Sequence, residues 1–126
     1  MQARIQPITF VNLQPIILMV LNSVGSAHTK RAYARGLTDF MAWFQATGQI
    51  GFNKATVNAY VTELHTAGRS ASSINGRLVA IRKLANEAAD NGLIDHAIAQ
   101  AVGRAQGVAG EGRRLGNWLD VGQAQA

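Results

Sequence analysis

The chain has 126 residues, a length that fits one domain and can bury a core without disulfide or metal staples. Cysteine is absent, which excludes disulfide scaffolds, cysteine nucleophiles and thiolate metal sites and suits a reducing cytoplasm. Twelve Lys and Arg residues outnumber seven Asp and Glu residues, and the net charge of +5 favours a polyanionic partner.

The first 25 residues form an apolar segment. The spacing of its apolar residues specifies secondary structure less clearly than in the rest of the chain. Its unbroken apolar run, 16–21, has six residues, whereas a membrane span needs about 20, so we expect no membrane partner. Pro15 suits the first turn of a short helix over 15–22. The β-branched residues of this segment would also suit a strand, although no partner strand is visible.

A long amphipathic helix is predicted over residues 27–46. Ser26 is a good N-cap, and Gly48 suits the position just after the helix. The apolar residues recur at spacings of four, three and four, which place them on one face: Tyr33, Leu37, Phe40 and Phe44.

Two further caps and stripes predict the second and third helices. Asn53 caps a helix that Gly68 ends, with Val57, Val61 and Leu64 on its inner face. Ser70 caps the third helix by accepting from the amide of residue 72 or 73, and 91–92 (Asn-Gly) ends it. The inner stripe of the third helix is Ile74, Leu78, Ile81, Ala85 and Ala88.

A shorter fourth helix follows Asp95, carries Ile98 and Val102, and fades near Gly107. The fold class is therefore all-α, a small bundle of four main helices to which a short N-terminal helix would be added. Residues 26–105 form the folded domain, 106–117 a linker rich in Gly and Arg, and 118–126 the beginning of a further segment.

The first basic patch lies in the opening turns of helix 27–46 and comprises Lys30, Arg31 and Arg35. Arg31 and Arg35 are four residues apart, so they share a face, away from the apolar stripe. Bases at a helix N-terminus repel one another and oppose the dipole. Bases at this position are expected where the helix N-terminus docks on a phosphate, because the free amides of the first turn also attract the anion.

The second basic patch covers residues 69–83, which hold four bases and no acid. Small polar side chains at the beginning of the third helix can lie close to a DNA backbone, and Gly76 leaves its turn open. A plain solvated face remains the alternative for each patch. A third cluster comprises Arg104, Arg113 and Arg114 around the linker, and it is equally compatible with a solubilising tail.

No catalytic constellation is evident in the sequence. His28 and Arg31 match His-x-x-Arg by chance, since no acid, base or nucleophile accompanies them. Tyr33 belongs to the apolar stripe, and Tyr60 is expected to be half-buried. The three histidines are scattered, so we expect no metal and no cofactor.

Taken in order, these motifs resemble the N-terminal core-binding domain of the tyrosine recombinase (phage integrase) family, a SAM-like helical bundle. The resemblance covers about residues 26–119. It rests on Ser26-Ala-His-Thr29-Lys-Arg-Ala-Tyr33, Leu37-x-x-Phe40-x-x-Trp43, Val57-x-x-Tyr60-Val61-x-x-Leu64, Gly68-Arg-Ser70-Ala-Ser-Ser73-Ile74-x-x-x-Leu78-x-x-Ile81-Arg82 and Ala88-Ala-Asp90-Asn-Gly92.

The resemblance implies a module that grips and positions double-stranded DNA while a separate catalytic domain exchanges strands. Residues 118–126, with Trp118 and Leu119, resemble the start of that catalytic domain, the rest of which is expected to be missing from this chain. The fragment itself would then not be an enzyme, it would act in the cytoplasm, and other recombinase protomers on the DNA would be further partners. Gly76 and Ala80 stand where the family often has longer, base-reading side chains, which favours contacts to the DNA backbone. The expected DNA contacts are His28, Thr29, Lys30, Arg31, Arg35, Arg69, Ser72, Ser73, Gly76, Arg77, Arg113 and Arg114.

Two other functions are compatible with the sequence. A helical protein-interaction module would use the apolar segment 8–24, and its binding would survive high salt. A stand-alone regulator would bind DNA without any recombination.

Overall fold

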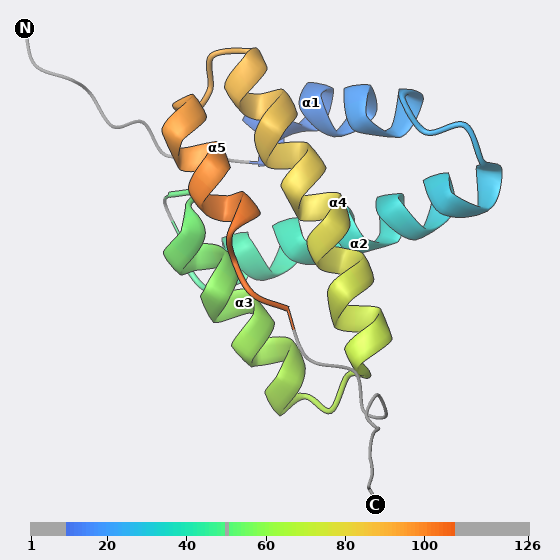
Figure 1. Cartoon of the computed structure of the whole chain (residues 1–126), viewed down its shortest axis with the longest axis vertical. Coiled ribbons are helices and arrows are strands. Elements are labelled where there is room, and N and C mark those ends of the chain that lie inside the picture. The colour runs from blue at the N-terminus through green and yellow to red at the C-terminus, as the bar shows by residue number, and fades with distance from the viewer. Residues whose placement is uncertain (1–9, 50, 108–126) are drawn as a thin grey trace, which may run out of the picture.

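The computed structural model describes residues 10–49 and 51–107, and this part of the chain is built from helices and short connections without strands (Figure 1). The helices are α1 (Phe10–Asn22), α2 (Ala27–Ala46), α3 (Lys54–Thr66), α4 (Ala71–Asp90) and α5 (His96–Gly103). The all-α fold class predicted from the sequence is confirmed.

Local capping fixes the beginnings of α2, α3 and α4 as predicted. Ser26 accepts a hydrogen bond from the Thr29 amide at 3.3 Å. Asn53 and Ser70 likewise accept from the amides three residues on, at 3.0 and 3.1 Å. Left-handed glycines follow the ends of these three helices: Gly48, Gly68 and Gly92, with φ between 72° and 84°. Glycine adopts this left-handed backbone conformation at little cost because it has no Cβ.

The N-terminal helix differs from its prediction. α1 begins at Phe10 rather than at residue 15, so the placement of Pro15 in its first turn is wrong. Pro15 lies inside the helix and costs it a backbone hydrogen bond. Burial outweighs this loss, because four apolar side chains of α1 are 6% exposed or less: Leu13, Ile16, Ile17 and Val20.

α1 is therefore part of the bundle rather than a segment separate from residues 26–105. It packs against both α2 and α4, and its buried side chains belong to the same core as those of the other helices. The predicted boundary at residue 25 falls between the end of α1 at Asn22 and the start of α2 at Ala27, in the short connection that Figure 1 shows between these helices. No helix in the described part of the chain is long and apolar enough to cross a membrane.

α4 is the central helix and contacts each of the other four. Its predicted stripe is buried, with every member 2% exposed or less. On one side of the core, Phe40 packs its ring against Phe44, Phe52 and Tyr60 at centroid distances of 5.1–5.9 Å. Tyr60 is 3% exposed rather than half-buried, because these aromatic rings cover it.

Candidate nucleic-acid interface

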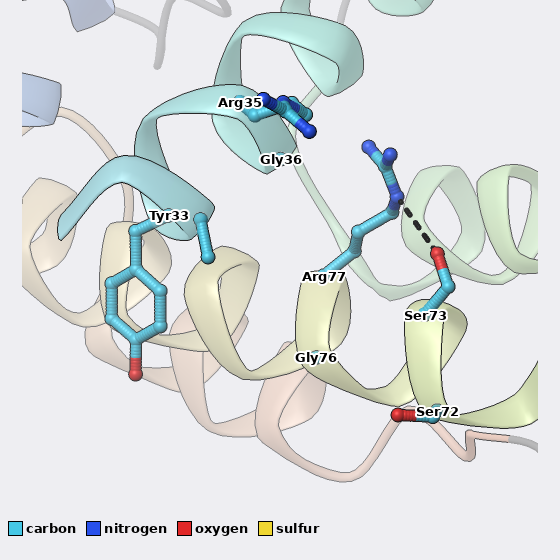
Figure 2. Close-up of a pocket in the computed structure, with 8 residues that line it drawn as sticks. Tyr33, Arg35, Gly36, Ser72, Ser73, Gly76 and Arg77 are labelled. Carbon is cyan, nitrogen blue, oxygen red and sulfur yellow. Dashed lines mark hydrogen bonds between the residues drawn. The ribbon is translucent and has the colours of Figure 1, made fainter. Parts of the chain in front are cut away.

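A shallow groove runs between the first half of α2 and the first half of α4 (Figure 2). Its volume is about 270 Å³, and its lining is Ala32, Tyr33, Arg35, Gly36, Ser72, Ser73, Gly76 and Arg77. Five of the residues predicted to contact DNA therefore meet here, although they come from patches some 40 positions apart in the chain: Arg35, Ser72, Ser73, Gly76 and Arg77.

Small residues allow the two helices to approach at the groove. Gly36 is buried, and a Cβ built on it would lie 3.5 Å from Cγ of Arg77. Ala80, one turn further along α4, is 1% exposed, so it is a packing residue and not a position that could read a base. Gly76 has a different role, since a Cβ there would meet nothing within 4 Å and open space is left beside the groove.

Arg77 is held by neighbouring side chains rather than presented free to solvent. Its Nη1 donates to Oδ2 of Asp39 at 2.8 Å, and its Nε donates to Oγ of Ser73 at 3.4 Å (Figure 2 shows the second bond). The Arg77 side chain is 10% exposed, whereas that of Asp39 is 44% exposed. The carboxylate thus neutralises much of the charge that the sequence alone assigns to this site.

Tyr60 lies beneath this ion pair, at the edge of the aromatic cluster. Burial raises the pKa of its hydroxyl, and the nearby Arg77 guanidinium opposes that rise. A phenol whose pKa is raised is a poor nucleophile, because its reactive anion is disfavoured. The structure therefore places Tyr60 in the core, deeper than the half-buried position expected from the sequence.

The second basic patch divides into two kinds of side chain. Arg69 and Lys83 are exposed, whereas Arg77 and Arg82 are engaged within the fold. Arg82 Nη2 donates to the Ala105 carbonyl at 2.7 Å, on the flank of α4 away from the groove. Sequence spacing could not separate these two kinds, because the partners lie 38 and 23 residues away.

The first basic patch supplies the unpaired cations of the site. Arg31 and Arg35 are exposed, and within the described part of the chain no hydrogen bond or ion pair occupies either guanidinium. Arg35 lies in the groove wall together with Arg77 (Figure 2). Lys30 is exposed too, but it projects about 100° away from Arg31 around the helix axis.

The remaining predicted contacts adjoin the groove or lie elsewhere. His28 is exposed in the first turn of α2, and Thr29 is partly buried with its amide bound to the Ser26 cap. Neither lines the groove. Arg113 and Arg114 lie outside the described residues, as do most of the predicted linker 106–117 and all of 118–126.

Two features of the site escaped the sequence prediction. Asp39 was not singled out, although it follows Arg31 and Arg35 at intervals of four on the same helix face. That spacing is a local signal that an acid ends the basic stripe. The small residues Ala32 and Gly36 also line the groove, and their small size is the only signal they offer. Among the described residues, no group of three His, Asp or Glu side chains could hold a metal ion.

Comparison with known protein families gives one match. Residues 19–92 match the family model described as phage integrase, N-terminal SAM-like domain. The matched range includes the end of α1 and the whole of α2, α3 and α4, and hence every residue that lines the groove. Searches against curated proteins and against solved structures found no match.

Proposed function

Because the chain belongs to the phage integrase family through its N-terminal SAM-like domain, we propose that it grips duplex DNA and positions it for strand exchange. The observation that carries this proposal is the groove between α2 and α4 with the unpaired Arg31 and Arg35 beside it. A net charge of +5 supports a polyanionic partner for the same surface.

The proposed contact is made mainly with phosphates. Arg31 and Arg35 would each neutralise a phosphate, and Ser72 is exposed so that its hydroxyl can donate to a phosphate oxygen. Gly76 lets the sugar-phosphate backbone approach α4 closely, since no side chain occupies that space. Lys30, His28, Thr29 and Arg69 would add contacts along the strand. Binding of this kind depends weakly on base sequence.

The proposal assigns no chemical step to this chain. Tyr60 is buried, so its hydroxyl is not placed to attack a phosphate, and Tyr33 packs partly buried against the core, with no neighbouring group in this proposal assigned to activate it. Strand cleavage would belong to a separate catalytic domain, and the matched range does not include such a domain. Other protomers bound to the same DNA would be the further partners, and the site of action would be the cytoplasm.

Salt dependence of duplex binding tests the proposal. The affinity of the chain should fall linearly on a log–log plot against salt, by about 0.9 per phosphate neutralised. Replacing both Arg31 and Arg35 with Ala should weaken binding to unrelated sequences alike and reduce the slope by about 2, one phosphate for each arginine.

A charge-matched control separates the groove from the total charge of the protein. Lys54 is in the first turn of α3, which lies far from the first turns of α2 in Figure 1. Lys54→Ala should leave the slope nearly unchanged. An equal loss of slope for this variant and for each arginine variant would refute the assignment of the site.

A further inference from the structure

One side of α4 carries a stripe of exposed residues, which we call the α4 crest: Ser72, Gly76, Val79 and Lys83. At about 100° per residue, these four positions lie within about 60° of one another around the helix axis. In Figure 1 α4 passes in front of α1 and α2, and these two helices leave the crest uncovered. The crest adjoins the groove, because Ser72 and Gly76 belong to both.

Val79 is the apolar member of the α4 crest and is 40% exposed. Within the described part of the chain, the other exposed large apolar residues lie on α1 or after the end of α4: Leu18, Met19 and Leu93. An exposed β-branched side chain lowers the stability of a helix relative to Ala, and it gains little from burial. The stability of the bundle therefore does not account for a valine at this position.

The charge around Val79 favours DNA as the partner that covers it. Residues 69–83 hold four bases and no acid, and Arg69 and Lys83 are exposed at the two ends of this range. A stable protein interface covers about 800 Å² on each partner and has an apolar centre. One valine among polar and basic residues offers too little apolar surface for such a centre, whereas a base edge needs an apolar contact for one methyl group only.

The spacing along the α4 crest fits the major groove of a duplex. An α-helix fits into this groove, where thymine presents a 5-methyl group that apolar side chains contact. Ser72 and Val79 are seven residues apart, which is about 10 Å along the helix axis or about three base-pair steps. Gly76 lies between them, and a Cβ there would meet nothing within 4 Å. No side chain on that turn therefore keeps a duplex away from Val79.

We propose that Val79 is a specificity-determining residue, whose methyl groups contact the 5-methyl group of a thymine in the major groove of the bound duplex. The inference rests on the proposed function, because it needs a duplex that lies over the first halves of α2 and α4. It adds a modest base preference to the phosphate contacts of Arg31 and Arg35. Burial of one methyl group supports a preference of about threefold to fivefold for thymine over a base without it.

Uracil differs from thymine only by the missing 5-methyl group and therefore tests the contact directly. Fluorescence anisotropy would compare the binding of the full chain to two labelled DNA hairpins of equal length, one with alternating A·T pairs and one with A·U pairs. The unmodified chain should bind the A·T hairpin about threefold to fivefold more tightly. Val79→Ala should weaken binding to the A·T hairpin about threefold and change binding to the A·U hairpin less than twofold, so that the preference disappears.

Leu18→Ala is the matched control, because it shortens an exposed apolar side chain of α1 that does not line the groove. This variant should keep the full preference for thymine. Val79→Ala should fold, since Val79 is exposed and Ala favours a helix more than Val does, and circular dichroism checks this. In the complex of the unmodified chain, a nuclear Overhauser effect between the Val79 methyl groups and a thymine methyl group should report the contact itself.

The outcomes separate this inference from the proposed function. Equal binding of the unmodified chain to both hairpins would overturn the contact. A preference for thymine that Val79→Ala retains would overturn it too, because another residue or the shape of the duplex would then carry the preference. Both results leave the proposed function standing, since the chain still binds DNA. Absence of binding to either hairpin would refute the proposed function, and this inference with it.

Discussion

The carboxylate of Asp39 limits how much positive charge the groove offers to a phosphate. It holds Nη1 of Arg77 at 2.8 Å and is itself partly exposed at the groove, on the helix face that carries Arg35. A phosphate that approaches Arg35 meets a guanidinium already paired with an acid at Arg77, and it is repelled by that acid. Asp39 therefore lowers the affinity of the groove for DNA, whereas the arginines raise it.

Removal of this carboxylate should tighten DNA binding. Asp39→Asn keeps the shape and an acceptor for Arg77, raises the charge of the groove by one, and should raise the affinity for duplex DNA about two- to fivefold at low salt. It should also lower the free energy of unfolding by about 1 kcal/mol, because a charge-assisted bond becomes a neutral one. Fluorescence anisotropy with labelled duplex and urea denaturation measure the two effects.

Glu63→Gln is the matched control, because it removes an exposed acid from α3 and changes the net charge equally. If both variants tightened binding by the same factor, total charge rather than the groove would determine affinity. At this scale the sequence placed Arg31 and Arg35 correctly on the exposed face of α2. It could not pair Arg77 with Asp39, because only the crossing of α2 and α4 brings the two together.

The crossing of α2 and α4 depends on Gly36 in a way that two substitutions can separate. A methyl group at residue 36 would lie 3.5 Å from Cγ of Arg77, an ordinary contact, so Gly36→Ala should gain up to about 1 kcal/mol of helix stability. Gly36→Leu should push Arg77 from its place and lower stability by about 1–3 kcal/mol. Urea denaturation of both variants checks this, and equal destabilisation by Ala and Leu would contradict the packing described.

Helix ends were predictable where the determinants are local. Ser26, Asn53 and Ser70 each bind an amide three residues on, so a few neighbouring letters specify where α2, α3 and α4 begin. α1 was not predictable in the same way. Pro15 suggested a helix beginning there, but burial of Leu13 against other helices extends the helix five residues earlier, and that contact is not local.

For the molecule as a whole, the buried face of α1 decides between two uses of the apolar segment 8–24. The core of the bundle buries four apolar side chains of α1: Leu13, Ile16, Ile17 and Val20. Within the part of α1 whose side chains the structure describes, the exposed large apolar residues are Leu18 and Met19. α1 is therefore mainly a stabilising element of the bundle. A protein-interaction role for it would have to rely on those two exposed side chains.

The packing of α1 predicts that substitutions on its buried face lower stability more than substitutions on its exposed face. Ile17→Ala should lower the free energy of unfolding by about 2–5 kcal/mol, as expected for a large-to-small change in a core. Replacing Leu18 and Met19 together with Ser should cost about 1 kcal/mol or less, because both side chains are already about half exposed. Thermal denaturation provides the comparison. A larger loss for the exposed pair would contradict the packing of α1.

The distribution of charge over the whole molecule leads to one decisive measurement. The full chain, labelled with ¹⁵N, would be titrated with a short DNA duplex at low and at high salt, and its amide shifts followed. We expect the shifts to concentrate in the first halves of α2 and α4, around Arg35 and Ser72, and to vanish at high salt. Shifts centred on the exposed face of α1, or shifts that persist at high salt, would contradict DNA binding through the groove.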